Sequence, residues 1–425
     1  MIGGGPGPLP DLGYPTPARR GTHLAVLGVG LLLAVVLRMI LLPTDGFRGD
    51  LDQFVLWVHG LATQPFGRAY DQNLSFPPVM VYIWGVLAAL EPAFRTATDA
   101  ADPVIRAVMK TPASLADLAI GLLVALELRG RPRWAIAAGL ATLLHPAVID
   151  VSAWWGQYES IYVLSGLVAF MLAVRGHPLP AAAFLGVALM TKPQALPLLV
   201  PFAAWFLARG GVRGAVLAGI VGAAVVALLW LPFLAAGGPA AYARNLSEYQ
   251  GDIFAVLSLR AWNVWWRLQE FWAGGQFVLD GTPIVGPLTF RHLGYLAAGL
   301  LEVVVFVAVY RSPTRRTLAL GLAAAILVAF TFLTTMHERY AFGALIFLVL
   351  LIPERRILAL WVALGIVMTL NLLAAIPPSE QIGALLPISG PLGVAGSLAM
   401  IALTFLVLRE TVASAREPAP VLRAA

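Results

Sequence analysis

Long apolar runs, separated by short polar turns, recur along nearly the whole chain. Several approach about 18–20 residues, the length that an α-helix needs to cross a bilayer. Because lipid offers no partners for backbone N–H and C=O groups, such runs must be helical, and they lack the alternation of barrel strands. The pattern predicts an all-α polytopic membrane protein with about 12 transmembrane helices. The predicted spans are 22–42, 111–128, 134–151, 160–174, 180–191, 194–208, 214–236, 292–310, 316–334, 340–352, 357–376 and 391–409.

Composition agrees with this class and excludes several others. Of 425 residues, 60% are hydrophobic and 12% are charged, and the mean hydropathy of +0.84 lies far above that of soluble domains. The chain has no cysteine, so it has no disulfide, thiolate nucleophile or zinc–thiolate site. The net charge is +6, but most basic residues lie in short loops between apolar runs, which indicates membrane orientation rather than nucleic-acid binding.

The basic clusters predict which loops are cytoplasmic. With these clusters inside, both tails are cytoplasmic, a single transmembrane domain covers 22–409, and the long segments 43–110 and 237–291 are external. The Gly- and Pro-rich tail 1–21 is expected to be disordered, and 410–425 forms the second tail. The expected location is the plasma (cell inner) membrane, as a multi-pass protein with its active site on the external face. The clusters are Arg19, Arg20, Arg129, Arg131, Arg133, Arg175, Arg209, Arg213, Arg311, Arg315, Arg316, Arg355, Arg356 and Arg409.

The apolar run that begins at Pro77 has two interpretations. It forms a juxtamembrane helix in the first external segment, or it crosses the membrane as 77–92 while 180–208 becomes one fused helix. The first is favoured because Lys192 and Gln194 interrupt the run 180–208 near its middle.

An acidic pair follows the first predicted span. Asp50 stands beside Gly49 at the expected start of a short helix, where a carboxylate can cap the helix or act as a general base. Asp52 lies two residues further on, about 200° away around a helix, so only one of the two can face a cavity. Capping alone remains the alternative role. Tyr70 and the Phe76-Pro77-Pro78 segment come next.

Three more polar clusters interrupt apolar runs. Trp154 and Trp155 suit an interfacial aromatic belt, but Gln157 and Glu159 at a helical hairpin suggest polar ligands that face inward. Lys192, with apolar residues on both sides, needs a carboxylate or a phosphate, and pairing with Glu159 is the structural alternative.

The last cluster runs from Thr335 to Tyr340 and contains three consecutive ionisable residues. Arg339 with His337 can clamp a phosphate, while Glu338 can hold the His or a metal. An interfacial salt-bridge cluster is the alternative. The pattern is not HExxH, so a zinc protease is not indicated.

The order of these clusters resembles the GT-C class of integral-membrane glycosyltransferases, in particular the bacterial polyprenyl-phosphate-sugar-dependent mannosyltransferase-like branch. The resemblance covers most of residues 22–352. It rests on the acidic pair, the Tyr and Phe-Pro-Pro segment, Trp-Gly-Gln-Tyr-Glu-Ser (155–160), Lys-Pro-Gln (192–194) and Met-His-Glu-Arg-Tyr (336–340). The chain departs from the common pattern at Glu159, where Asp is frequent, and at His145, where Asn is frequent.

The resemblance implies an inverting transfer of mannose or another hexose from a polyprenyl-phosphate donor to an external glycan, lipid or protein. Asp50 would be the catalytic base, and the Lys-Pro-Gln and His-Glu-Arg-Tyr segments would bind the donor phosphate. No cofactor is indicated with certainty, and a divalent metal is possible. The expected partners are the donor, the acceptor and membrane lipids, without nucleic acid. The substrate-binding candidates are Asp52, Tyr70, Gln157, Glu159, Lys192, Gln194, His337, Glu338, Arg339 and Tyr340.

Two other functions fit parts of the pattern. A secondary transporter or lipid flippase would use the buried Lys192 and Glu159 as a coupling or substrate site, although no internal repeat is found. A non-enzymatic membrane scaffold would not need the cluster at His337–Tyr340. Convergence of Asp50, Lys192 and Arg339 in one external cavity would favour the enzyme.

Overall fold

Helices form nearly all of the regular structure, as the apolar runs predict. A computed structural model describes residues 17–252, 254–274 and 276–416 of the chain. The α-helices are α1 (Pro17–Leu41), α2 (Arg48–Thr63), α3 (Pro78–Leu90), α4 (Pro103–Glu127), α5 (Pro132–Leu143), α6 (Pro146–Ile149), α7 (Glu159–Val174), α8 (Pro178–Leu189), α9 (Leu199–Leu234), α10 (Gly238–Asp252), α11 (Val264–Ala273), α12 (Phe290–Arg311), α13 (Arg315–Phe332), α14 (Phe342–Val349), α15 (Arg355–Ala375), α16 (Glu380–Leu385) and α17 (Pro391–Arg416).

Short irregular elements connect these helices. The 3₁₀ helices are η1 (Phe66–Asp71), η2 (Pro92–Arg95) and η4 (Pro193–Leu198), and η3 (Asp150–Trp155) is a π-helical turn. The strands are β1 (Ser258–Leu259), β2 (Pro283–Val285), β3 (Leu288–Thr289) and β4 (Met336–His337). β1 pairs with β4 in parallel, and β2 pairs with β3 in antiparallel orientation.

Six of the described helices are long and apolar enough to cross a membrane, in agreement with the predicted class of fold. A seventh is added if α5 and the helix Pro146–Trp155, bent by 45° relative to each other, count as one span. The predicted count of twelve spans is not confirmed. The six ranges are Pro103–Glu127, Pro193–Leu234, Phe290–Arg311, Arg315–Phe332, Arg355–Ala375 and Pro391–Arg416.

Helix α9 changes direction at Gly211, where φ is 60° and ψ is −169°. A Cβ atom on Gly214 would lie only 3.9 Å from the backbone oxygen of Phe206. In an uninterrupted helix these residues would be about 12 Å apart along the axis, so the chain folds back here. The break falls between two predicted spans and supplies the reversal that they require.

The predicted span 340–352 is corrected by the structure. It contains only α14, whose 8 residues extend about 12 Å, far less than the roughly 30 Å of a bilayer core. All of these residues are buried, and α14 packs against α7, α13 and α15. The run is apolar because it fills the protein interior, where the surroundings are other helices rather than lipid.

The chain ends also differ from the predicted boundaries. Helix α1 begins inside the predicted tail 1–21, and α17 continues into the predicted tail 410–425. The predictions for residues 1–16 and 417–425 fall outside the described residues.

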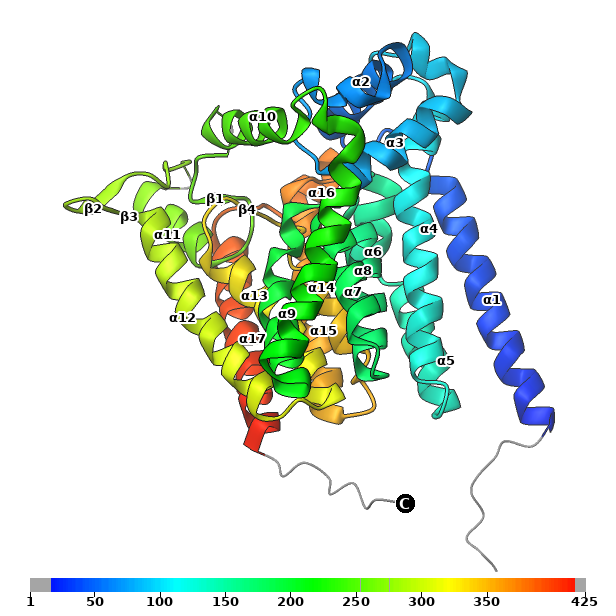
Figure 1. Cartoon of the computed structure of the whole chain (residues 1–425), viewed down its shortest axis with the longest axis vertical. Coiled ribbons are helices and arrows are strands. Elements are labelled where there is room, and N and C mark those ends of the chain that lie inside the picture. The colour runs from blue at the N-terminus through cyan, green and yellow to red at the C-terminus, as the bar shows by residue number, and fades with distance from the viewer. Residues whose placement is uncertain (1–16, 253, 275, 417–425) are drawn as a thin grey trace, which may run out of the picture.

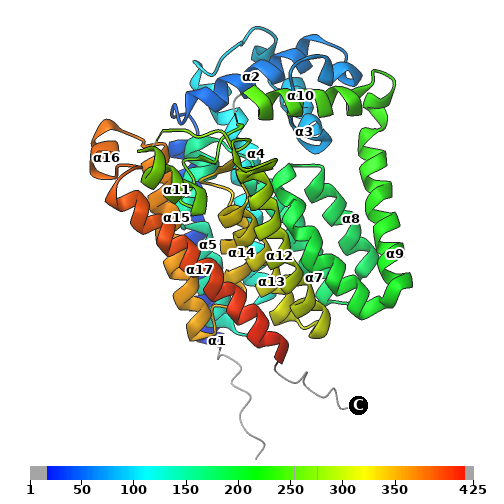
Figure 2. The ribbon, with the colours of Figure 1, turned by 90° about the vertical axis from the view of Figure 1, so that its left-hand side faces the viewer.

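Helices α2, α3 and α10 form a layer over one end of the bundle (Figures 1 and 2). Aromatic side chains pack this layer together, among them Phe54, Trp57 and Trp84, and Tyr158 of the bundle contacts them from below. Helix α3 has 13 residues, fewer than the roughly 20 that a span needs. Its place beside α2 agrees with the juxtamembrane interpretation of the run at Pro77.

Candidate functional site

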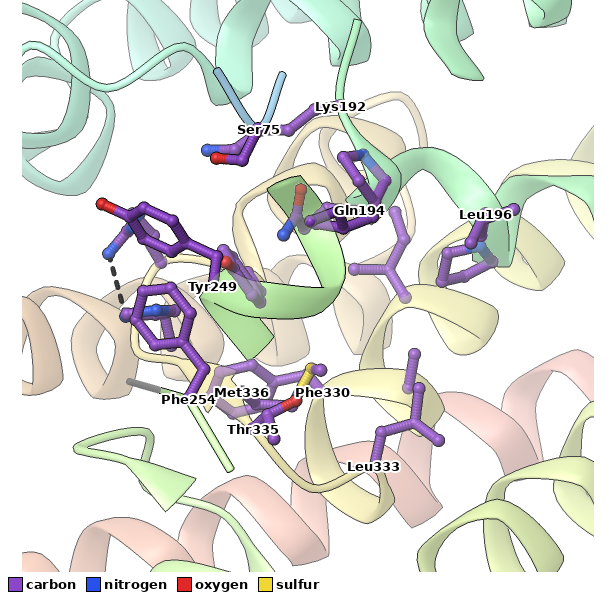
Figure 3. A pocket seen from close by; sticks show the side chains of 18 of the residues that line it. Ser75, Lys192, Gln194, Leu196, Tyr249, Phe254, Phe330, Leu333, Thr335 and Met336 are labelled. Atoms are coloured by element: carbon purple, nitrogen blue, oxygen red, sulfur yellow. Dashed lines mark hydrogen bonds between the residues drawn. The ribbon is translucent and has the colours of Figure 1, made fainter. Parts of the chain in front are cut away.

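A cavity of about 550 Å³ lies where the layer of α2 and α10 meets the bundle. Its polar side chains come from parts of the chain far apart in sequence and include Asp50, Gln157, Lys192 and Arg339. Figure 3 shows Lys192 and Ser75 at one end of the cavity and Phe330 and Leu333 at the other. The three residues chosen to separate an enzyme from a transporter therefore line one cavity.

Asp50 lies in the first turn of α2 but does not cap it. The indole Nε1 of Trp155 donates to its Oδ2 at 2.9 Å, and the amide Nε2 of Gln157 donates to the same oxygen at 2.5 Å. The helix begins after Phe47, which makes no side-chain capping bond. Tertiary contacts rather than helix capping therefore fix the Asp50 carboxylate.

Glu159 lies at the centre of a buried ion-pair network. Its Oε1 is 2.5 Å from Nζ of Lys192 and 3.3 Å from Nε of Arg339, the latter without hydrogen-bond geometry. Nζ of Lys192 also donates to Oε1 of Gln157 at 3.2 Å. Gln157 thus touches the carboxylate of Asp50 with one end of its amide and the ammonium of Lys192 with the other. The pairing of Lys192 with Glu159, weighed as the structural alternative, is present.

Aromatic rings enclose both cations. The guanidinium carbon of Arg339 lies 4.7 Å from the ring centre of Trp155 and 5.4 Å from that of Tyr340. Nζ of Lys192 lies 5.7 Å from the ring centres of both Tyr340 and Phe76. Cation–π contacts of this kind strengthen when water is excluded, so the rings help to keep both charges in the interior.

The segment from Thr335 to Tyr340 is held by β-pairing rather than by a helix. Leu259 of β1 pairs with His337 of β4, and Thr335 adopts a left-handed φ of 63°. This conformation aims His337 and Arg339 at the cavity, where Nη1 of Arg339 lies 2.9 Å from Glu338 Oε1 and 3.2 Å from His337 Nδ1.

His337 is uncharged near neutral pH. Burial lowers its pKa well below the usual value of about 6.5, and the positive charges of Arg339 and Lys192 lower the pKa further. Because a guanidinium only donates, the contact from Arg339 requires an unprotonated Nδ1 on His337.

Acidification is expected to destabilise the protein through His337. Below about pH 6.5 the unfolded chain takes up a proton that the half-buried imidazole of the folded protein excludes. This contribution to the free energy of unfolding is therefore complete above that pH and is lost as pH falls towards the folded pKa. Unfolding titrations of the wild type and His337→Gln at several pH values measure this loss. If the free energy of unfolding of the two proteins had the same pH dependence, the imidazole of His337 would not be held neutral in the folded protein.

Four predicted substrate-binding residues do not line the cavity, and two of them, Asp52 and Tyr70, also lie away from the ion-pair network. Asp52 faces the opposite side of α2, where it bonds Arg48 at 2.8 Å and the backbone N–H of Ala100 at 2.8 Å. Tyr70 is buried, and its hydroxyl donates to the carbonyl of Phe76 at 3.0 Å. Both stabilise the layer above the bundle.

The other candidates divide between the cavity wall and the support behind it. Glu159 and Glu338 are buried and hold the cations from behind. The candidates on the wall are Asp50, Gln157, Lys192, Gln194, His337, Arg339 and Tyr340.

Sequence reasoning did not single out several residues of the cavity. The ring centres of Tyr249 in α10 and Phe254 lie 5.3 Å apart with the rings tilted, and Phe254 also contacts His337 (Figure 3). No motif marks this aromatic pair, of which Tyr249 lies near the end of α10 and Phe254 lies just after it. Glu302 was detectable, because it is an acidic residue inside the predicted span 292–310.

Comparison with known proteins assigns no family. No family model matches the chain, and no curated protein shows significant similarity to it. Among the described residues, no group of three or more His, Asp or Glu side chains is arranged to hold a metal ion.

Proposed function

We propose that this protein is a GT-C-type glycosyltransferase that moves a hexose from a polyprenyl-phosphate donor to an acceptor at the external membrane face. The observation that carries the proposal is the cavity, which combines the carboxylate of Asp50 with the cations Lys192 and Arg339. A positioned base and cations for a leaving phosphate are the groups that such a transfer needs.

The part of the cavity that is lined by Leu196 and by residues of α12 suits a lipid chain. Leu196 and Tyr295 line it and are 56% and 58% exposed, on helices of membrane-spanning length. The small residues Ala298 and Gly299 of α12 form the wall between them. The cavity therefore reaches the outer surface of apolar helices, and under this proposal a lipid-linked donor enters it there from the bilayer.

The charges near the cavity set a condition on donor binding. In the ion-pair network around Lys192 and Arg339, Asp50, Glu159 and Glu338 carry three formal negative charges against the two positive charges of these cations. A donor phosphate would add another negative charge. Lys192 and Arg339 must therefore contact the phosphate while they keep their carboxylate partners.

The proposed transfer is a single displacement. Both protein donors reach Oδ2 of Asp50, so Oδ1 is the oxygen that an acceptor hydroxyl would approach. The acceptor proton passes to Asp50 as the acceptor oxygen bonds to the anomeric carbon. The bond from that carbon to the phosphate oxygen breaks, and Lys192 and Arg339 stabilise the charge left on the lipid phosphate.

A reconstituted assay tests this function. Purified protein in liposomes would receive radiolabelled polyprenyl-phosphate mannose, glucose or arabinose, with cell extract as the acceptor pool and nucleotide sugars as donor controls. We expect transfer from at least one lipid-linked donor and none from a nucleotide sugar. Transfer from the nucleotide sugar alone, or from no donor, would contradict the proposal.

Arg339→Ala is expected to weaken donor use by about 10- to 100-fold, because a charge-assisted hydrogen bond contributes roughly 1.5–3 kcal/mol. Arg339→Lys should recover part of the loss, because lysine restores the positive charge but lacks the planar guanidinium group that donates two parallel hydrogen bonds. The measurement is the dependence of transfer rate on donor concentration. Wild-type donor dependence in folded Arg339→Ala protein would show that the phosphate binds elsewhere.

Two matched variants support that measurement. Glu338→Gln removes a negative charge 2.9 Å from the guanidinium, so donor affinity should rise rather than fall. Arg356→Ala removes an exposed arginine outside the cavity and should change nothing.

A second function is favoured by Glu302 of α12. It lines the cavity at membrane depth, and both its carboxylate oxygens are buried without a hydrogen-bond partner among the described residues. An unpaired acid in this position is typical of a transporter or lipid flippase. Lipid movement between leaflets, measured in the same liposomes, tests this. Loss of that movement in Glu302→Gln, with no sugar transfer in the wild type, would favour transport.

A further inference from the structure

A second buried polar cluster lies outside the cavity, around Asp117 of α4. This side chain has no exposed surface and does not line the cavity. Nη2 of Arg38 in α1 contacts its Oδ2 at 3.0 Å. The hydroxyls of Ser152 and Ser160 donate to Oδ2 and Oδ1. Neutralising Arg38 explains the ion pair, but it does not explain why two hydroxyls from another part of the chain bind the same carboxylate.

The two serines stand on either side of the residues that hold the cavity charges. Ser152 lies in η3 and Ser160 in the first turn of α7. Between them, Trp155 and Gln157 donate to Asp50, and Glu159 holds Lys192. One carboxylate therefore fixes both ends of the segment 152–160.

This segment lacks the support of an ordinary helix. Element η3 is a π-helical turn that ends at Gly156, where φ is 92°. The backbone N–H of Gln157 reaches back to the carbonyl of Val151 at 2.8 Å. π-Helical turns are rare and occur often at functional sites, where they redirect side chains.

The segment also packs directly on the helix that carries Asp50. A Cβ atom on Gly156 would lie 2.7 Å from Cδ2 of Leu51, so no side chain fits between them. A shift of the segment would move Trp155 and Gln157 relative to α2. The position of the Asp50 carboxylate thus depends on what fixes the segment.

We propose that Asp117 is a positioning residue: through Ser152 and Ser160 it fixes the segment 152–160, and the segment in turn orients the carboxylate of Asp50. The effect on turnover rests on the proposed function of Asp50, whereas the effect on the segment does not. Asp117 acts through other side chains and touches no substrate.

Ser152→Ala tests the proposal, because it removes one link and leaves the Arg38–Asp117 ion pair intact. We expect kcat to fall about tenfold, with KM for the donor unchanged, since a misplaced base affects only the chemical step. In an Asp50→Asn background, Ser152→Ala should cause no further decrease in kcat. Hydrogen exchange of the peptide covering 150–158 should become faster, independently of any activity.

Ser114→Ala is the matched control. Ser114 is buried in the same helix as Asp117, but its hydroxyl makes no hydrogen bond within the described residues. This variant should keep wild-type kcat and exchange. Either of two results would overturn the proposal. One is unchanged hydrogen exchange at 150–158 in Ser152→Ala. The other is a loss of activity from Ser152→Ala that is the same in the wild type and in Asp50→Asn. If no donor supports transfer at all, the proposed function fails, and the exchange measurement still decides whether Asp117 fixes the segment.

Discussion

Asp50→Asn is expected to reduce turnover by about 10²–10⁴-fold, the usual contribution of a general base. Asparagine keeps an oxygen that can accept from Trp155 and Gln157, which donate at 2.9 and 2.5 Å, so the local geometry should survive. The variant loses only the basicity of the side chain. Single-turnover kinetics with a saturating lipid-linked donor, together with thermal unfolding, would show a stable protein that still binds donor.

Asp52→Asn is the matched control for this prediction. Asp52 lies two residues away on the same helix, but it contacts Arg48 and the backbone of Ala100 instead of the cavity. Its loss should affect turnover only slightly. If Asp50→Asn turned over at the normal rate in the defined assay, the base would lie elsewhere.

Glu159→Gln is expected to lower the free energy of unfolding by about 3–5 kcal/mol. Glu159 has no exposed surface, and its carboxylate lies 2.5 Å from Lys192 and 3.3 Å from Arg339. Glutamine has nearly the same shape, but it leaves the buried ammonium of Lys192 without its carboxylate partner and leaves Arg339 paired only with Glu338. Denaturant titration of the purified protein in detergent measures the loss.

A double-mutant cycle separates this charge effect from packing. Lys192→Met alone should also be strongly destabilising, whereas the pair with Glu159→Gln should cost much less than the sum, because neither charge then remains unpaired. The exposed pair Arg68–Asp71, at 2.6 Å, is the control, and Asp71→Asn should cost less than about 1 kcal/mol. Additive losses for Glu159 and Lys192 would show that their ion pair does not stabilise the fold.

The sequence by itself determined the class of the fold and the composition of the polar clusters. A run of apolar residues about 20 long requires a helix wherever it meets lipid, whatever the rest of the chain does. Charged residues are costly in such runs, so Lys192 and Glu159 stand out without any knowledge of their neighbours. The interruption of the helix near Lys192 follows for the same local reason, and η4 begins at the next residue.

Sequence did not determine which helices reach lipid. The run that contains α14 is as apolar as a span, yet the helix is short and enclosed by α7, α13 and α15. Apolar side chains are stable both in a protein interior and in the core of a bilayer. Only the packing of other helices around the run distinguishes the two surroundings.

Tertiary structure alone decided which carboxylate faces the cavity and what holds it there. Asp50 and Asp52 are chemically the same and two positions apart, but the partners that fix Asp50 lie 105 and 107 residues further along the chain. The aromatic pair Tyr249 and Phe254 and the buried Asp117 likewise gain their roles from distant segments. Hydrogen bonds and ion pairs depend on distance in space, and a linear sequence does not record that distance.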